Sequence, residues 1–260
     1  MKKNFKLLFM FFVVLFVVLS SYCNGEESAE QGNADAQYNL SSMYDNGEGV
    51  AKDSKKAFEL CTKSAEQGNA DAQYDLGCIY RIGYGVEKDY KKAVELYTKS
   101  AEQGNAEAQY VLGIMYDNGY GVEKDSKKAV ELYTKSAEQG YAQAQYILGL
   151  MYYSGSGVEK DYKKAVEWYT KSAEQGNAHA QFNLGCMYYK GEGVEKDYKK
   201  AFEWYTKSAE QGNSDAQYIL GLMYMKGYGV EKDYKKAVEW YTKSAEQGNA
   251  HAKSLLDISH

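Results

Sequence analysis

The sequence predicts an all-α fold, a stack of helical hairpins, and three observations support this prediction. The segment Ala-Glu-Gln-Gly first begins at Ala29 and returns every 36 residues along the chain. Each copy carries two stretches with apolar residues at helical spacing, and glycine-rich segments separate them. The 260 residues include no proline, which fits a chain that is helical almost throughout.

The repeat also predicts the domain organisation. Six complete copies and part of a seventh exceed the roughly three repeats that such a stack needs. Each copy contacts mainly its neighbours in folds of this kind, so we expect residues 26–260 to form one solenoid domain. The partial copy over 245–260 is expected to be its C-terminal cap.

The first helix of each copy, here called helix A, is clearest in the second copy. Leu76, Ile79 and Tyr80 follow the spacing of one helix face, which predicts a helix over 70–82. The segment that starts at Gly83 ends this helix, because two glycines so close together favour a loop.

The second helix, helix B, follows this loop. Asp89 stands directly before the next apolar pattern, where its carboxylate can accept the free amides of a new helix. This predicts a helix over 90–103, with Ala93, Val94 and Tyr97 on its buried side. Gly104 then provides the left-handed residue that commonly ends a helix.

Glycine recurs inside helix A, where it costs about 1 kcal/mol of helix propensity relative to alanine. Recurrence at one position predicts a close approach of two helices there, against small residues of helix B such as Ala93. The first copy has Ser41 at this position, and the other copies have Gly77, Gly113, Gly149, Gly185 and Gly221.

Residues 1–25 differ from the rest and have the pattern of a secretory signal peptide. Lys2, Lys3 and Lys6 form a positive start, and an apolar run of 13 residues follows from Leu7 to Leu19. A bilayer span takes about 17–25 apolar residues, so a cleaved leader is favoured over a permanent transmembrane helix. We therefore expect the protein to be exported, to the periplasm, the cell envelope or the extracellular space.

Cys23 directly follows the apolar run, which makes it a candidate for lipid attachment. Bacterial lipoprotein signals usually have a small residue before this cysteine, whereas Tyr22 is large. A soluble exported form is therefore favoured over a lipid-anchored one, and contact with a membrane is expected only through the leader or such an anchor.

The second copy resembles the Sel-one-like repeat, a relative of the tetratricopeptide repeat. The resemblance covers 29–260, and Glu87 departs from the proline that is common after the loop in this family. It implies a right-handed α-solenoid that works as an adaptor in protein assembly. The residues that carry it are Gly68-Asn69-Ala70-Asp71-Ala72-Gln73, Leu76-Gly77, Tyr80, Gly83-Tyr84-Gly85-Val86, Asp89, Lys92-Ala93 and Tyr97-Thr98-Lys99-Ser100.

Composition and spacing give no support for catalysis, a metal site or a cofactor. The formal net charge is −5 and both signs alternate along every copy, without the basic block that nucleic-acid binding needs. The Gly-x-Gly loops recur in every complete copy, as hairpin loops do, and lack the preceding strand of a phosphate loop. The acids also recur with the period, and the three histidines do not have metal-ligand spacing.

Cys61 and Cys78 lie on either side of the turn at Gly68, so a disulfide between them is one alternative to two free thiols. Cys186 is expected to be a small buried or groove residue. The resemblance includes cysteine-rich bacterial relatives that are linked to β-lactam binding or hydrolysis. Most copies in this chain lack cysteine, so that activity does not transfer.

Four positions of helix A differ between copies while their neighbours stay the same. In the second copy they are Asp71, Asp75, Cys78 and Ile82, and their spacing places them on one helix face, here called the variable stripe. We predict that the stripe is a concave partner-binding groove, and the alternatives are neutral drift or contact between adjacent A helices. The predicted groove residues are Asp71, Asp75, Ile82, Glu107, Val111, Ile114, Asn118, Gln143, Ile147, Leu150, Asn183, Lys190, Ile219, Leu222 and Lys226.

The function predicted from the sequence is an exported, monomeric adaptor that binds a protein or peptide in this groove. An envelope hydrolase that resembles the cysteine-rich relatives is one alternative, and a purely structural spacer is another. A hydrolase requires a unique cluster of polar residues, which the periodic acids do not provide.

Overall fold

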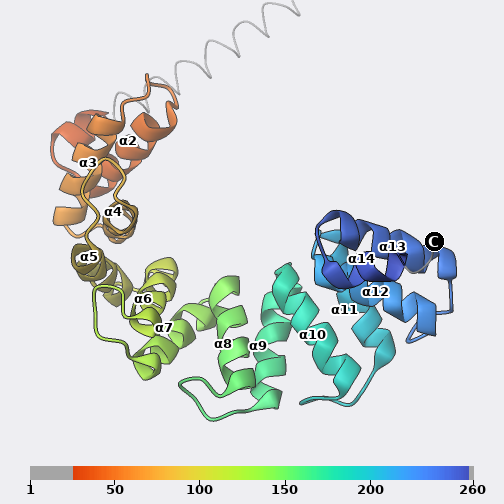
Figure 1. The fold of residues 1–260 in the computed structure, drawn as a ribbon. Coiled ribbons are helices and arrows are strands. Elements are labelled where there is room, and N and C mark those ends of the chain that lie inside the picture. Colours follow the sequence, from red (N-terminus) through yellow and green to blue (C-terminus); the bar gives the residue numbers. More distant parts are fainter. Residues whose placement is uncertain (1–25, 258–260) are drawn as a thin grey trace, which may run out of the picture. The chain divides into compact units, whose positions relative to one another are not determined.

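The computed structural model describes residues 26–257, and all regular secondary structure in this range is α-helical. This confirms the predicted all-α fold, with the helices paired into hairpins at the repeat spacing (Figure 1). The A helices are α2 (Ala34–Asn46), α4 (Ala70–Ile82), α6 (Ala106–Asn118), α8 (Ala142–Ser154), α10 (Ala178–Lys190), α12 (Ser214–Lys226) and α14 (Ala250–Asp257). The B helices are α3 (Ser54–Glu66), α5 (Tyr90–Glu102), α7 (Ser126–Glu138), α9 (Tyr162–Glu174), α11 (Tyr198–Glu210) and α13 (Tyr234–Glu246).

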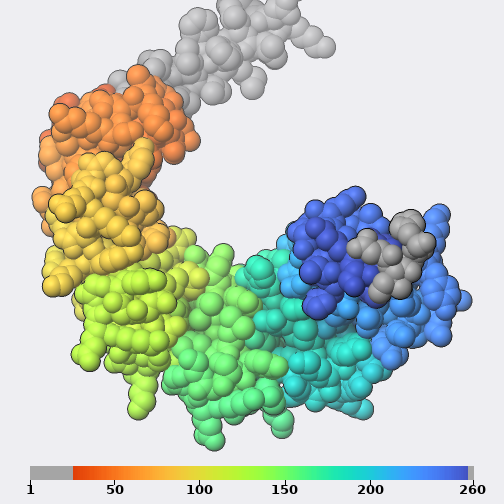
Figure 2. Space-filling model, viewed as in Figure 1, coloured from red at the N-terminus to blue at the C-terminus, as the bar shows by residue number. Residues whose placement is uncertain are grey.

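The chain divides into two compact units. The first unit runs to Met115 and includes Gly119–Glu123, and the second comprises Tyr116–Asn118 and the chain from Lys124 onwards. Within the first unit, α3 packs between α2 and α4, and α4 packs on α5. Within the second unit, each helix from α7 to α14 packs on the next one, so that neighbouring repeats lie directly against each other (Figure 2).

Helix boundaries follow from the capping residues that the sequence repeats. The Asn69 side chain accepts a hydrogen bond of 2.8 Å from the Ala72 amide at the start of α4, and Gly83 ends this helix with a φ of +82°. Asp89 likewise accepts a bond of 3.0 Å from the Lys92 amide at the start of α5. Both helices therefore begin where the sequence predicts, because a side-chain oxygen satisfies amides that have no partner within the helix.

The core of each repeat lies between its two helices and the adjacent repeat. Ala72 and Leu76 of α4 form one buried cluster with Cys61 and Ala65 of α3, the B helix of the preceding repeat. The same pattern recurs in the second unit, where Tyr169 and Leu184 belong to one buried cluster with alanines of α9 and α10. Burial of these apolar side chains is the main stabilising contribution, at about 1.5–3 kcal/mol for a fully buried large side chain.

The recurring glycine of helix A faces a tyrosine ring of helix B, and not the small Ala93-type residues that we expected. A Cβ atom built on Gly77 would lie 2.8 Å from the Tyr97 ring, and one on Gly185 would lie 2.9 Å from the Tyr205 ring. The tyrosine ring of helix B packs against the backbone of helix A at the glycine. It therefore occupies the space that a side chain at the glycine position would take. The close approach agrees with the expectation, but the nearest partner is the tyrosine; at Gly221 the Ala93-type residue Ala237 also lies close, with its carbonyl oxygen 3.1 Å from a Cβ built on the glycine.

Buried polar groups form hydrogen bonds both between the two helices of a repeat and between consecutive repeats. The Ser100 hydroxyl is fully buried and donates a bond of 2.7 Å to the Ala70 carbonyl oxygen. Gln73 donates to the Ala65 carbonyl oxygen at 3.1 Å, and the Gln103 amide donates to Gln73 Oε1 at 2.8 Å. Among the described residues, every buried side-chain nitrogen and oxygen has a partner, which explains how repeated serine and glutamine are tolerated in the core.

Candidate functional site

The variable stripe has the same profile of exposure in each repeat. Its outer positions are exposed and its inner positions are half-buried, so the stripe can be reached from solvent along its length. The exposed members are Asp71, Ile82, Glu107, Asn118, Gln143, Lys190 and Lys226, and the half-buried members are Asp75, Val111, Ile114, Ile147, Leu150, Asn183, Ile219 and Leu222. The second group includes most of the apolar side chains, which gives each stripe an apolar centre between polar ends.

The inner positions also contribute to the stacking of repeats. Leu150 packs against the buried cluster of α9 and α10, and Ile219 packs against the cluster of α11 and α12. This fits the alternative that contact between helices constrains part of the stripe. The exposed outer positions have no such role in the core, so packing alone does not account for their differences.

A cavity of about 450 Å³ opens on the stripe in the second unit. Its wall includes three stripe residues, His179, Asn183 and Asp215, with the rings of Tyr146 and Phe182. The centroids of the Tyr146 and His179 rings lie 5.9 Å apart, which joins α8 to α10 across the stripe. Gly212 and the start of α12 complete the wall. Aromatic rings beside amide and carboxylate groups are a typical lining for a peptide-binding surface.

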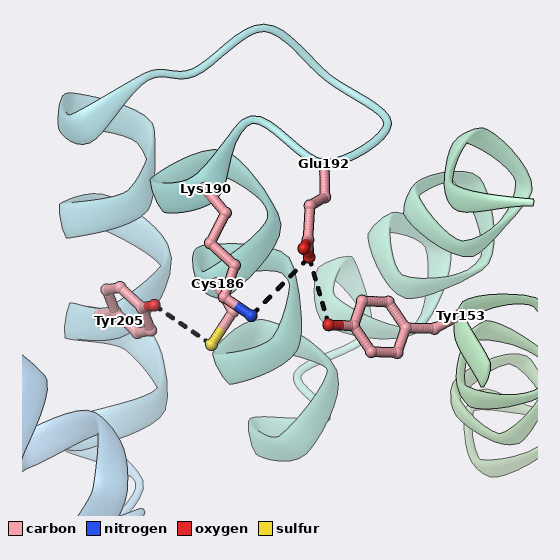
Figure 3. Close-up of polar contacts among 5 residues, drawn as sticks. All are labelled: Tyr153, Cys186, Lys190, Glu192 and Tyr205. Carbon is pink, nitrogen blue, oxygen red and sulfur yellow. Dashed lines mark hydrogen bonds and ion pairs between the residues drawn. The ribbon is translucent and has the colours of Figure 1, made fainter.

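A polar contact bridges α8 to the loop after α10 beside the same stripe (Figure 3). The Tyr153 hydroxyl donates a hydrogen bond of 3.2 Å to Glu192 Oε2, and Lys190 Nζ lies 3.8 Å from the same oxygen. The Tyr205 hydroxyl donates to Cys186 Sγ at 3.2 Å, and burial raises the pKa of the Cys186 thiol. These contacts fix the positions of Lys190 and Cys186, so this part of the stripe is pre-organised.

The first unit has a different arrangement, centred on Asp75. The Tyr38 hydroxyl on α2 donates a hydrogen bond of 3.0 Å to Asp75 Oδ2 on α4. Burial raises the pKa of the Asp75 carboxyl group, and the negative charges of Asp71, Glu107 and Asp45 raise it further, while the hydrogen bond from Tyr38 lowers it. A half-buried acid with a raised pKa is a common feature of functional sites.

Asp75 lines a cavity of the first unit that has a volume of about 620 Å³. Its lining residues come from α2, α3, α4 and the loop after α4, and are Ser41, Ser42, Asp45, Ser54, Lys55, Ala57, Phe58, Cys61, Asp75, Cys78, Ile79, Tyr84 and Gly85. This polar cluster was not predicted from the sequence, in which most acids recur with the repeat period. The available signal was Asp75 itself, since no other copy has an acid at its repeat position.

Six consecutive segments of the chain match the Sel1 repeat, over 34–69, 70–105, 106–141, 142–177, 178–213 and 214–249. The chain belongs to the Sel1 repeat family. Each matched segment begins with or beside the first residue of an A helix, so the match has the same period as the hairpins.

Two solved structures are similar to this Sel1 repeat protein. A protective antigen present in uropathogenic Escherichia coli strains, which displays an SLR fold, is 42% identical with a TM-score of 0.84. The alignment covers 88% of this chain and 49% of that chain, so this chain spans about half of the antigen's length. A Sel1 repeat protein from Oxalobacter formigenes is 37% identical with a TM-score of 0.77, over 91% of this chain and 69% of that one. A comparison with curated proteins found no match.

The cysteines of this Sel1 repeat protein are free within the described range 26–257. Cys61 Sγ donates to the Ala72 carbonyl oxygen at 3.5 Å, whereas Cys78 Sγ accepts a bond of 3.2 Å from the Tyr97 hydroxyl. The two thiols have different hydrogen-bond partners in the structure, and a disulfide between Cys61 and Cys78 stays a prediction. Cys186 is half-buried and is at the stripe position that Cys78 has in the second repeat.

Other predictions concern the leader and metal binding. Residues 1–25, with Cys23 as the candidate lipid-attachment site, lie outside the described residues. Between 26 and 257 no helix has both the length and the apolar character that a membrane crossing requires. The same range contains no cluster of histidine, cysteine and acidic side chains suited to holding a metal ion.

Proposed function

We propose that this Sel1 repeat protein is an exported adaptor that binds a protein or peptide partner along its A helices. The observation that carries the proposal is the separation of constant and variable positions. The buried alanine, leucine and glycine positions keep the same residue types in nearly every repeat, whereas the accessible stripe differs from repeat to repeat. A purely structural spacer would not require apolar side chains at such accessible positions.

The second unit supports this proposal through the cavity beside Tyr146 and Phe182. Aromatic rings are enriched where proteins bind partners, because they supply contact area, and amide groups beside them can supply hydrogen bonds. The contacts of Tyr153 with Glu192 hold the neighbouring part of the stripe in place. A pre-organised surface loses little conformational freedom on binding, which favours affinity.

Site-specific photocrosslinking in the native cell envelope tests the proposal directly. A photoreactive amino acid at Gln143, an exposed stripe position on α8, is expected to crosslink the partner. The matched control places the same amino acid at Glu167, which is exposed on the neighbouring B helix α9. Crosslinks of one protein from position 143 alone support the proposal, while equal crosslinking from both positions, or from neither, contradicts it.

Substitution of the stripe provides a second test. The double variant Val111→Asp/Ile147→Asp puts charge into the apolar centre and is expected to lose the crosslinked partner. Val238→Asp is the control, because Val238 is an exposed apolar residue on the B helix α13. Circular dichroism shows whether both variants remain folded. The spacer alternative requires that the double variant keeps every association of the parent protein.

A further inference from the structure

The cavity of the first unit results from small residues at positions where the fourth repeat has larger ones. Ser42, Asp45, Ser54 and Cys61 all line the cavity. In the fourth repeat the corresponding residues are Leu150, Tyr153, Tyr162 and Tyr169. Four small or short side chains therefore replace a leucine and three tyrosines.

The fourth repeat shows how those larger side chains fill the same place. The Tyr153 and Tyr162 rings lie 5.3 Å apart, centroid to centroid, and Tyr169 is almost fully buried. Tyr153 reaches Glu192 in the loop after α10, which corresponds to the loop that carries Tyr84 in the first unit (Figure 3). Without these rings the first unit keeps an open cavity of about 620 Å³, within the range of about 300–1,000 Å³ that is typical of ligand sites.

The chemistry of the cavity wall favours a cation with an apolar stem. Asp45 and Asp75 contribute two carboxylates, and Lys55 is the only basic residue in the lining. Phe58, Ile79 and other apolar groups face the same space, and aromatic rings attract cations as well as hydrocarbon. Tyr38 holds one Asp75 oxygen in place through its hydrogen bond.

The rim of the cavity favours a macromolecular occupant over a free amine. Tyr84 lines the opening and is 61% exposed, and Ile82 next to it is 63% exposed. Exposed apolar side chains beside a pocket are typical of protein-binding surfaces, where they cover the residues that flank an inserted side chain.

We propose that this cavity accepts a lysine or arginine side chain of the partner, with its charged end at Asp75 and its aliphatic stem against Phe58 and Ile79. The proposal rests on the adaptor function, since it specifies the chemistry of the partner at one point of the stripe. Residues near Tyr84 on the rim contact the main chain on either side of the inserted residue.

Fluorescence anisotropy with short labelled peptides tests the proposal on the purified protein. The probe Gly-Ser-Leu-Lys-Leu-Ser-Gly, and its form with arginine in place of lysine, are expected to bind. The matched peptide with norleucine has the same stem without the charge and is expected to bind at least about tenfold more weakly. Unlabelled n-butylammonium, added as a competitor, distinguishes a free amine from a peptide side chain.

Two variants test whether the peptides bind in this cavity. Asp75→Asn removes the charge with little change in shape, and Ser54→Tyr supplies the ring that the fourth repeat has at Tyr162. Each is expected to weaken binding of the lysine peptide at least about tenfold. The matched controls are Glu95→Gln, an exposed acid on α5, and Ser126→Tyr, which adds the same ring at the same repeat position in the second unit.

Several outcomes would overturn the proposal. Equal binding of the lysine and norleucine peptides, or unchanged binding by a folded Asp75→Asn variant, excludes recognition of a basic side chain here. Displacement of the peptide by n-butylammonium at concentrations as low as those of the peptide itself assigns the cavity to a free amine. If the peptides fail while Gln143 still crosslinks a partner, the cavity proposal falls and the adaptor function stands.

Discussion

The hydroxyl group of Tyr38 on α2 lies 3.0 Å from Oδ2 of Asp75 on α4, and its hydrogen bond joins the first repeat to the second. Burial opposes ionisation of both groups, so the pKa of the Tyr38 hydroxyl is raised as well as that of the Asp75 carboxyl. The nearby charges of Asp71 and Asp45 add to the cost of a negative charge on Asp75. The first two repeats therefore contain a carboxylate that is costly to ionise.

Asp75→Asn is expected to increase the free energy of unfolding at neutral pH. The pKa of Asp75 is higher in the folded protein than in the unfolded chain, so the folded state binds more protons and loses stability as pH rises through the folded pKa. Asparagine keeps an acceptor for Tyr38 and carries no charge. Urea denaturation from pH 3 to pH 8, with Glu95→Gln as control, checks the expectation. A variant that is less stable than the parent at pH 7 would contradict it.

Gly185→Ser is expected to lower the free energy of unfolding by about 1–3 kcal/mol, because the added Cβ atom meets the Tyr205 ring at 2.9 Å. In a Tyr205→Cys background, which lacks the obstructing ring, the serine is expected to cost less than it does in the parent protein. The first repeat already has this combination, with Ser41 and Cys61 at the two positions. A double-mutant cycle in urea measures the coupling. Additive effects of the two substitutions would show that glycine and tyrosine do not depend on each other.

Ser208→Ala is expected to lower the free energy of unfolding by about 0.5–1.5 kcal/mol. The Ser208 hydroxyl is fully buried and donates a hydrogen bond of 2.7 Å to the Ala178 carbonyl oxygen, so its loss leaves that oxygen without the bond. Ser254→Ala on α14 is the control, since Ser254 is exposed. Thermal denaturation compares the two variants, and equal melting temperatures would refute the contribution of the buried bond.

Cys61 is expected to resist alkylation in the folded protein. Burial raises the pKa of its thiol to about 12, so the reactive thiolate is scarce at pH 8. Iodoacetamide treatment followed by peptide mass mapping is expected to show slow labelling of Cys61 in buffer and complete labelling in urea. A peptide that links Cys61 to Cys78 in a non-reducing digest would instead prove the disulfide that the structure lacks.

Much of the fold could be predicted from the sequence because its determinants are local. The helix predicted over 70–82 is α4 (Ala70–Ile82), and the one predicted over 90–103 ends at Glu102, with Gln103 as its cap. Asn69 and Asp89 act on amides within three residues of themselves. Helix capping of this kind depends on residues that are close in the sequence, and the repeat presents the same capping pattern several times.

The partner of the recurring glycine and the cavity at Asp75 could not be predicted in the same way. Both depend on how far helix B is rotated against helix A, which decides that Tyr97, and not Ala93, faces Gly77. The cavity depends further on volume that is missing at four separated positions of the first repeat. A periodic pattern hides such differences, since each one alone resembles ordinary variation at an accessible site.

The pairing of glycine with tyrosine, and of Ser41 with Cys61, constrains the order in which the first repeat diverged from its duplicated neighbours. Both exchanges, tyrosine to cysteine and glycine to serine, are single-nucleotide changes in the genetic code. Serine first would have forced a clash with the ring, whereas cysteine first would have left only empty space that the fold can tolerate. Cysteine at position 61 therefore has two consequences: it leaves room for Ser41, and it removes volume at one of the four positions that open the cavity of the first unit.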